Sequence, residues 1–222
     1  MRIAGETPNA GVADEHFSVC CSFLQEVGLK IIDYQTYMVL REGAEVLEVD
    51  HCGEKVLRLR DGNILKLFRR KRLISSALWY PYAQRFADNA RSLLELGIAA
   101  PNVLDVFKVP SISRDVVVYQ PVPGSTIREL LRAGISADEK ESVRARFLIF
   151  ANDLLDRGVY FRSMHLGNVV YMPDGRFGLI DVADVNMYGS SLSWFTRFRF
   201  FRRVNRFKED ALWFGSRSNE GA

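Results

Sequence analysis

Two oxygen-bearing side chains in the second half of the sequence have the types and positions of a metal site. Asn168 ends the loop "FRSMHLGN", and Asp181 directly follows the apolar stretch "FGLI". The turn residues of "PDGR" between them predict a β-hairpin, which would bring Asp181 next to Asn168. Mg²⁺ prefers amide and carboxylate oxygens, and an unpaired carboxylate at the end of an apolar strand is costly to bury. The pair therefore predicts a metal and phosphate site, although Asn168 could equally serve as a loop or cap residue.

Three other residues could take part in the same chemistry. Lys66 lies in an alternating stretch of the first half, where a lysine is either a functional residue or a solvated strand residue. His165 is either a phosphate contact or a residue that packs the loop. Asp184 is either a further carboxylate of the site or a cap of the next segment. Phosphoryl transfer needs cations on the phosphate oxygens, ligands for those cations and a group that orients the acceptor hydroxyl, and these residue types suit those tasks.

The first half of the sequence predicts an antiparallel sheet with one helix. Residues 45–68 alternate in hydrophobicity and contain the hairpin signal "DGN", which predicts three strands in a meander with Lys66 in the third. Between residues 74 and 97, apolar residues recur at helical spacing and Gly97 supplies a stop. The stretches "APNVLDVFKV" and "SRDVVVYQPV" then predict further strands.

The second half of the sequence predicts mainly helices. "PGSTIRELLRAG" favours a short helix with Ser125 as its N-cap and Glu129 nearby. Residues 136–158 predict a long amphipathic helix, whose apolar face is formed by Val143, Phe147, Phe150, Leu154 and Leu155. The whole order of elements predicts an α+β protein with two lobes. We expect a loose tail (residues 1–16), a sheet lobe (17–120) and a short helical lobe (121–222).

The stretch "SLSWFTRFRFFRRVNRF" predicts a basic amphipathic helix. Trp194, Phe198 and Phe201 follow one side of it, and the opposite side gathers Arg199, Arg202, Arg203 and Arg206. One interpretation is contact with an anionic membrane surface through residues 194–208. A second is binding of a phosphorylated sugar, because arginine suits phosphate. In a third, the aromatic side chains close the helical lobe while the arginines are solvated.

Composition and charge exclude several classes of protein. The 222 residues are 48% hydrophobic and 26% charged, which allows one domain or two small lobes around a cleft. The net charge of +3 is too balanced for a dedicated nucleic-acid-binding protein, so we expect no nucleic-acid partner. Cys20, Cys21 and Cys52 form neither a disulfide framework nor a zinc spacing. Without a signal-peptide pattern or a membrane-spanning apolar run, the sequence predicts a cytoplasmic protein, with peripheral contact to the inner face of the inner membrane as a further hypothesis.

In these motifs the chain resembles the protein-kinase-like superfamily. It most resembles the small bacterial branch of lipopolysaccharide-core sugar kinases and toluene-tolerance proteins. The family's catalytic-loop pattern H-R-D-x-x-x-x-N lies over "FRSMHLGN", and its metal-binding aspartate lies over Asp181 in "LIDVAD". Lys66 matches the strand lysine that contacts the α- and β-phosphates of the nucleotide. The stretch "VVVYQPVPGSTIRELL" resembles the hinge between the lobes, where the backbone near Tyr119, Gln120 and Val122 would meet adenine.

The resemblance implies a two-lobed kinase-like fold with a small antiparallel N-lobe and a short helical C-lobe. It also implies ATP and Mg²⁺ as cofactors, with Asn168 and Asp181 as the metal ligands. A lipid-linked sugar or the lipopolysaccharide core is the implied partner, because few residues follow Asp181 and little room remains for peptide-binding helices.

The sequence departs from the family's pattern at three places. Ser163 stands where the family has the aspartate that accepts the acceptor's proton, and a serine hydroxyl is no general base near neutral pH unless another group takes its proton. The glycine-rich phosphate cover is reduced to Gly53 in "DHCGEK". The helix glutamate that pairs with the strand lysine is replaced by Asn89, with Asp88 or Glu95 as possible substitutes.

These observations support three hypotheses from different classes. The first is an ATP- and Mg²⁺-dependent kinase-like protein of lipopolysaccharide core assembly, whose catalysis rests on positioning and charge neutralisation. The second is a pseudokinase, a nucleotide-binding or scaffold module in envelope biogenesis, which Ser163 and Asn89 favour and the intact metal pair disfavours. The third is a peripheral membrane adaptor that uses only its C-terminal helix.

Overall fold

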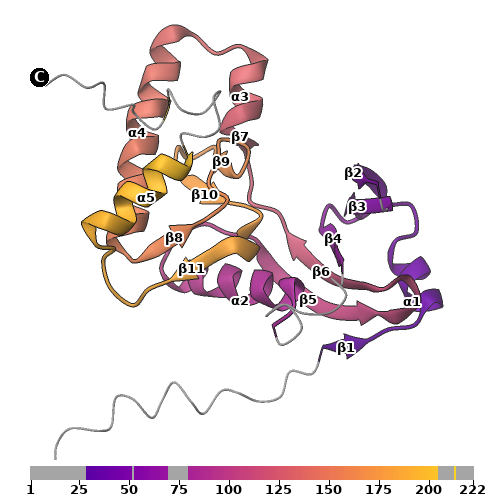
Figure 1. The fold of residues 1–222 in the computed structure, drawn as a ribbon. Helices are drawn as coiled ribbons and strands as arrows, with labels where there is room; N and C mark the ends of the chain where they lie inside the picture. Colours follow the sequence, from indigo (N-terminus) through magenta and orange to yellow (C-terminus); the bar gives the residue numbers. More distant parts are fainter. Residues whose placement is uncertain (1–28, 52, 70–79, 205–212, 214–222) are drawn as a thin grey trace, which may run out of the picture.

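The computed structural model describes residues 29–51, 53–69, 80–204 and 213. The expected N-terminal tail, the three cysteines and Arg206 lie outside these ranges. The α+β class predicted from the sequence is confirmed (Figure 1). A six-stranded sheet with a helix packed on it forms one part of the molecule, and helices with two small sheets form the other. This arrangement is consistent with a kinase-like fold.

The large sheet contains the meander predicted for residues 45–68. Its strands lie in the order β1 (Lys30–Ile31), β5 (Asn102–Val109), β6 (Arg114–Gln120), β4 (Ile64–Arg69), β3 (Gly53–Arg58) and β2 (Glu45–Asp50). Neighbouring strands are antiparallel except β1, which runs parallel to β5. Lys66 lies between Val56 and Val117 of the adjacent strands, so it starts from the middle of the sheet. Helix α1 (Tyr34–Leu40) and a 3-10 turn (Pro110–Ile112) flank the sheet.

Helix α2 (Tyr82–Glu95) supplies the core between the two parts of the molecule. Its buried side is formed by Ala83, Phe86, Ala87, Ala90 and Leu93. The Phe86 ring lies 5.9 Å from the ring of Phe68 and 5.2 Å from the ring of Tyr119. The helix falls within the predicted range of residues 74–97, although residues 70–79 lie outside the described part of the chain.

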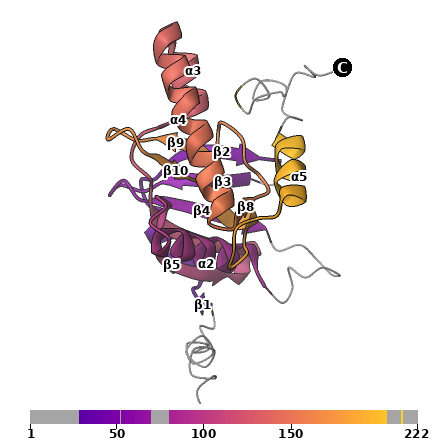
Figure 2. The same ribbon diagram turned by 90° about the vertical axis from the view of Figure 1, so that its left-hand side faces the viewer.

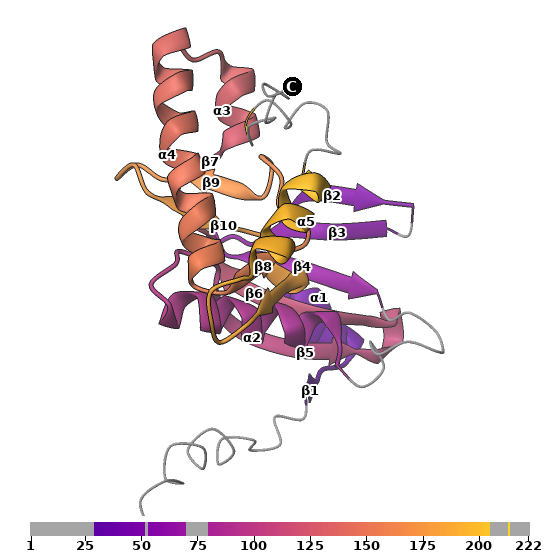
Figure 3. The ribbon, with the colours of Figure 1, turned by 60° about the vertical axis from the view of Figure 1, so that its left-hand side comes forward.

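Helices α3 (Ile127–Ala133) and α4 (Ala137–Asp156) form a hairpin at the end of the molecule away from β1 (Figures 1 and 3). The prediction of Ser125 as the N-cap of α3 is wrong, because Thr126 occupies that position. Thr126 and Glu129 form a capping box, which requires the acidic residue three positions after the cap. Ser125 belongs to strand β7 (Ser125–Thr126). Along α4, the predicted apolar face is buried at Val143, Phe147, Leu154 and Leu155 and half-buried at Phe150.

Short strands flank the loop that contains Ser163 and Asn168. Strand β9 (Val169–Tyr171) pairs with β10 (Phe177–Leu179), which confirms the predicted hairpin, and β9 also pairs with β7. Strand β8 (Val159–Phe161) pairs with β11 (Val185–Met187). A 3-10 turn (Val182–Asp184) precedes β11, and helix α5 (Trp194–Val204) comes after it. None of the helices in the described part of the chain is long and apolar enough to span a bilayer.

Candidate functional site

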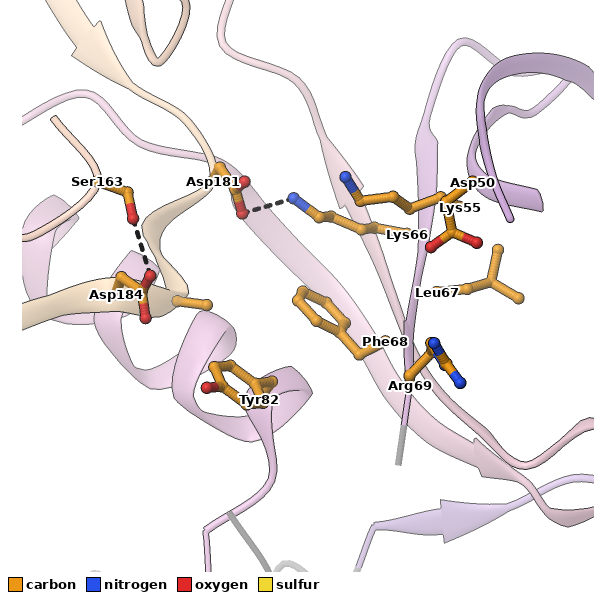
Figure 4. Close-up of a pocket in the computed structure, with 11 residues that line it drawn as sticks. Asp50, Lys55, Lys66, Leu67, Phe68, Arg69, Tyr82, Ser163, Asp181 and Asp184 are labelled. Atoms are coloured by element: carbon orange, nitrogen blue, oxygen red, sulfur yellow. Dashed lines mark hydrogen bonds and ion pairs between the residues drawn. The ribbon is translucent and has the colours of Figure 1, made fainter. Parts of the chain in front are cut away.

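A cavity of about 270 Å³ lies where the large sheet meets the segment after β10. Side chains from both parts of the molecule converge on it (Figure 4). Its lining consists of Asp50, Lys55, Lys66, Leu67, Phe68, Arg69, Tyr82, Ser163, Asp181, Ala183 and Asp184. The sequence-predicted residues Lys66, Ser163 and Asp181 thus meet in a single cavity.

Lys66 and Asp181 form an ion pair across this cavity. The Lys66 Nζ donates a hydrogen bond to Asp181 Oδ1 over 2.6 Å. The lysine side chain is 8% exposed and the aspartate side chain is 44% exposed. The Lys66 Nζ also lies 5.5 Å from the ring centre of Phe68 and 5.7 Å from that of Phe86. The lysine is therefore a buried cation, whereas the carboxylate remains accessible from the cleft.

Asp181 adopts a backbone conformation that is uncommon for a side chain of its kind. Its φ is 56° and its ψ is 44°, in the left-handed region. Aspartate visits this region more readily than most residues, but the conformation still costs free energy and requires support from the surroundings. Asp181 lies between β10 and the 3-10 segment Val182–Asp184. The carboxylates of Asp181 and Asp184 therefore line the same cavity from one short stretch of chain.

The hairpin places Asn168 next to the start of this segment. The Ile180 backbone N–H donates to the Asn168 carbonyl over 3.0 Å, so the end of β10 lies beside the end of the loop. The Asn168 side chain is buried, and its Nδ2 donates to the Ser163 carbonyl over 2.9 Å. Because that bond engages the amide nitrogen, the side-chain oxygen is the atom that Asn168 can offer to a cation.

Ser163 and Asp184 form a second polar pair in the cavity. The Ser163 hydroxyl donates to Asp184 Oδ2 over 2.8 Å. The backbone N–H of Arg162 donates to the Asp184 carbonyl over 3.2 Å, which ties the loop to the 3-10 segment a second time. Asp184 therefore lines the same cavity as Ser163 and Asp181.

Asn89, expected in place of a glutamate that pairs with Lys66, binds backbone carbonyls. Its Nδ2 donates to the carbonyls of Val182 and Val185 over 2.8 and 3.0 Å, with a longer contact of 3.4 Å to that of Ala183. It thereby fixes α2 to the segment after Asp181. The suggested substitutes serve elsewhere: Asp88 accepts hydrogen bonds from Tyr80 and Gln84, and Glu95 is exposed at the end of α2.

The hinge residues lie outside the lining of this cavity. Tyr119 is buried against Phe86, and its pKa is raised, first by burial and then by the negative charge of Asp181. The Gln120 side chain accepts a hydrogen bond from Asn102. Val122 belongs to a small buried cluster with Val170 and Met172. The structure therefore places the predicted adenine-contacting stretch at the junction of the sheet and the β9–β10 hairpin.

His165 also lies outside the lining and supports the loop. Its Nδ1 accepts a hydrogen bond from the Gly167 backbone N–H over 3.1 Å. This bond holds the turn that leads into Asn168. The geometry agrees with the loop-packing interpretation of this histidine.

Sequence reasoning missed Lys55, a second cation in the cavity (Figure 4). Its Nζ donates to Glu48 Oε1 over 2.5 Å. The pKa of Lys55 is raised, chiefly by this bond and by the charge of Glu48, with smaller contributions from Asp181 and Asp50. Alternation gave no signal for it, because Val56 lies opposite Lys66 and Lys55 is therefore assigned to the other face of the sheet. Lys55 belongs to the part of β3 where the pairing with β2 is irregular.

Comparisons with known proteins give only a distant likeness. Neither a protein-family profile nor a curated protein sequence matches the chain. Among solved structures, a co-crystal structure of WbdD with the kinase inhibitor LY294002 is 22% identical, with a TM-score of 0.45 over 68% of this chain and 34% of that one. A structure of the bifunctional kinase-methyltransferase WbdD is 21% identical, with a TM-score of 0.46 over the same shares. The chain therefore spans about a third of the length of WbdD.

The residues present fit a Mg²⁺ ion that is completed by phosphates. Mg²⁺ is held in such sites by one or two carboxylates together with water and substrate phosphate, and needs no cage of protein ligands. The half-exposed Asp181 carboxylate is a ligand of that kind. The Asn168 side-chain oxygen is a second candidate, although this buried side chain lies outside the lining of the cavity. No group of three histidine, cysteine or acidic residues gathers as a self-sufficient metal site in the part of the chain that the structure describes.

Proposed function

We propose that the cavity binds a Mg²⁺–nucleotide and that the protein transfers a phosphoryl group to a hydroxyl of a lipid-linked sugar, in the assembly of the lipopolysaccharide core. The observation that carries the proposal is the 2.6 Å pair between Lys66 and Asp181 in a cavity that both halves of the chain line. A buried cation facing an accessible carboxylate suits an anionic ligand that arrives together with its metal.

Each residue of the pair has a separate task in this proposal. Lys66 holds the phosphates, because its ammonium is buried and has a fixed direction. Lys55 adds a second positive charge from the adjacent strand. Asp181 and Asn168 hold Mg²⁺, which when bound neutralises the charge on the phosphates. In the absence of ligand, the ion pair balances the positive charge of Lys66 with the negative charge of Asp181.

Asp184 supplies the base that position 163 lacks. The acceptor oxygen attacks the terminal phosphorus, the bond from that phosphorus to the bridging oxygen breaks, and the nucleoside diphosphate leaves with the electron pair. If the acceptor hydroxyl donates to Ser163 Oγ, its proton passes to the serine as the serine's own proton passes to Asp184 Oδ2 over the existing 2.8 Å bond. A serine is then adequate at this position because a carboxylate takes its proton.

Nucleotide binding is the first test of the proposal. Calorimetric titration with ATP should give binding that requires Mg²⁺ in the wild-type protein and is lost in Asp181→Asn. The matched control is Asp153→Asn, the same chemical change at an exposed ion pair with Arg157 on α4. Absence of Mg²⁺-dependent binding in the wild type would contradict the proposal.

Turnover then tests the role of Asp184. We expect Asp184→Asn to lower the release of ADP from ATP by about 10²–10⁴-fold, the usual contribution of a general base, while nucleotide binding is retained. Ser163→Ala should have a smaller effect, since the acceptor can reach Asp184 directly or through water. Purified lipopolysaccharide is the acceptor probe, with water as the background acceptor. Equal turnover in the wild type and Asp184→Asn would exclude Asp184 as the base.

A pseudokinase is the second candidate. The observation that favours it is Asn89, which binds backbone carbonyls where a catalytic pair would involve a carboxylate and Lys66. Mg²⁺-dependent ATP binding without ADP release, both with and without lipopolysaccharide, would support this alternative over the transferase.

A further inference from the structure

Helix α5 presents an unusual surface to solvent. The sequence pattern predicted that the aromatic residues gather on one side and the arginines on the other, and the structure divides the helix differently. Phe200 is the buried aromatic, 2% exposed and in ring contact with Tyr160. By contrast, Trp194 is 75% exposed, Phe195 60% and Phe198 52%. The helix therefore closes the lobe with Phe200 and the half-buried Phe201, and leaves the other three aromatic residues outside.

The exposed aromatics share their half of the helix with arginines. At 3.6 residues per turn, a single half of the circumference carries Trp194, Phe195, Phe198, Arg199, Arg202 and Arg203, and all six are exposed. The helix contains no acidic residue along its length. Two contacts order the surface itself, since the rings of Trp194 and Phe198 stack at 6.0 Å and the Arg199 guanidinium lies 6.0 Å from the Phe195 ring.

We propose that this face of α5 docks on the surface of an anionic lipid bilayer. Charge complementarity supports this partner: the face is purely cationic and aromatic, and it lies on a single helix at the periphery of the molecule (Figure 2). Aromatic rings partition into the interface between headgroups and acyl chains, while arginines beside them meet lipid phosphates. An aromatic face without arginines would suit a protein groove equally well, but interleaved arginines suit a bilayer surface that offers phosphates at every position.

The docking face contacts the loop of the candidate site through one hydrogen bond to a backbone carbonyl. Arg203 Nε donates to the Arg162 carbonyl over 2.9 Å, and Arg162 immediately precedes Ser163. The opposite side of α5 is held to the end of α4, where Arg197 donates to Asp156 and to the Leu192 carbonyl. Docking through α5 thus brings the loop with Ser163 close to the bilayer, where a lipid-linked acceptor would be presented. The surface itself does not depend on nucleotide binding.

The test is binding to vesicles in the absence of nucleotide. The full chain should co-sediment with vesicles of phosphatidylethanolamine and phosphatidylglycerol and should not co-sediment with vesicles of phosphatidylcholine alone. The variant Arg199→Glu/Arg202→Glu leaves the Arg203–Arg162 bond in place and should weaken binding by roughly 30-fold or more, because each arginine near such a surface contributes a factor of several. The matched control is Arg60→Glu/Arg91→Glu, the same charge change at two arginines that are about 70% exposed elsewhere.

A fluorescence measurement locates the contact on the helix. The emission of Trp194 should shift to shorter wavelength on anionic vesicles, and Trp194→Phe should lose the shift but keep most of the binding. Equal binding to neutral vesicles, no binding to either vesicle, or full binding by the α5 charge-reversal variant would each overturn the proposal. A dimer in light scattering that Trp194→Ser/Phe198→Ser dissociates, without vesicle binding, would assign the face to a second copy of the chain. Vesicle binding with no ATP binding would leave this proposal standing and refute only the proposed function.

Discussion

Removing either partner of the Lys66–Asp181 pair should have unequal consequences for stability in the absence of ligand. Asp181→Asn leaves an ammonium that is 8% exposed without a counter-charge. Breaking a fully buried pair by removing one partner costs about 3–5 kcal/mol. Here the Asp181 carboxylate is 44% exposed, so the pair is only partly buried and we expect a cost of about 2 kcal/mol. Asparagine tolerates the left-handed backbone at this position, so the substitution adds no strain of its own.

Lys66→Met should cost less, about 1 kcal/mol or below. Methionine fills a similar volume beside two aromatic rings, and the Asp181 carboxylate, already 44% exposed, can be hydrated. For a protein of this size, 1 kcal/mol corresponds to about 2–4 °C in Tm. We therefore expect Asp181→Asn to lower Tm by about 4–8 °C and Lys66→Met by about half of that or less.

Urea denaturation of the two single variants and the double variant tests whether the two losses of stability are unequal. The double variant Lys66→Met/Asp181→Asn should be more stable than Asp181→Asn alone, because it removes the uncompensated charge. Equal losses in the two single variants, or no recovery in the double variant, would show that the pair is solvated and that Lys66 is not held as a buried cation.

Three other predictions concern the surroundings of the site. Asn89→Leu should lower the free energy of unfolding by about 2 kcal/mol, because three backbone carbonyls lose a donor. The control is Asn152→Leu at an exposed position on α4, which should change the free energy of unfolding by less than about 1 kcal/mol. Similar urea midpoints for the two variants would contradict this prediction. Gly124→Ala should lower Tm in thermal melts, because Gly124 has a φ of 125° and an added Cβ would collide with the Tyr171 carbonyl. A Tm equal to that of the wild type would argue against this packing. Because the pKa of Tyr119 is raised, the unfolded chain loses this proton before the folded protein does as pH rises above about 10. The free energy of unfolding should therefore be highest below that pH and decrease above it. The fall between about pH 9.5 and pH 11 should be smaller in Tyr119→Phe, and an unchanged fall would assign it to other groups.

Elements with local signals were predictable from the sequence. The meander follows from alternation and "DGN", and α4 follows from a helical apolar period preceded by Ser136, which caps it. Lys66 and Asp181 were identified because each lies in a strand or at its end, where a charged residue is conspicuous. The short α3 showed the limit of such signals, since Ser125 and Thr126 are both good caps and only the spacing to Glu129 separates them.

The contacts that complete the site were not predictable, because they join distant parts of the chain. Asn89 reaches a carbonyl 93 positions away, and Ser163 meets a carboxylate 21 positions away. No periodicity encodes such pairs, since they depend on how α2 and the 3-10 segment pack together. The sequence left open which side of α5 is buried, for a related reason. Aromatic residues on a helix usually mark the buried side, and only the packing of Phe200 shows which side that is here.

The distance in sequence between Lys66 and Asp181 has a consequence for folding. The two residues are 115 positions apart, so their contact closes a long loop and forms only when both halves of the chain are in place. An isolated sheet segment or an isolated helical segment would carry half of the pair and no cavity. A ligand of the cavity therefore binds only the native chain, and at a concentration about 100 times its Kd it should raise the free energy of unfolding by about 2.7 kcal/mol. In a thermal-shift screen of nucleotides and sugars, a compound that binds this cavity would then raise the Tm of the whole molecule.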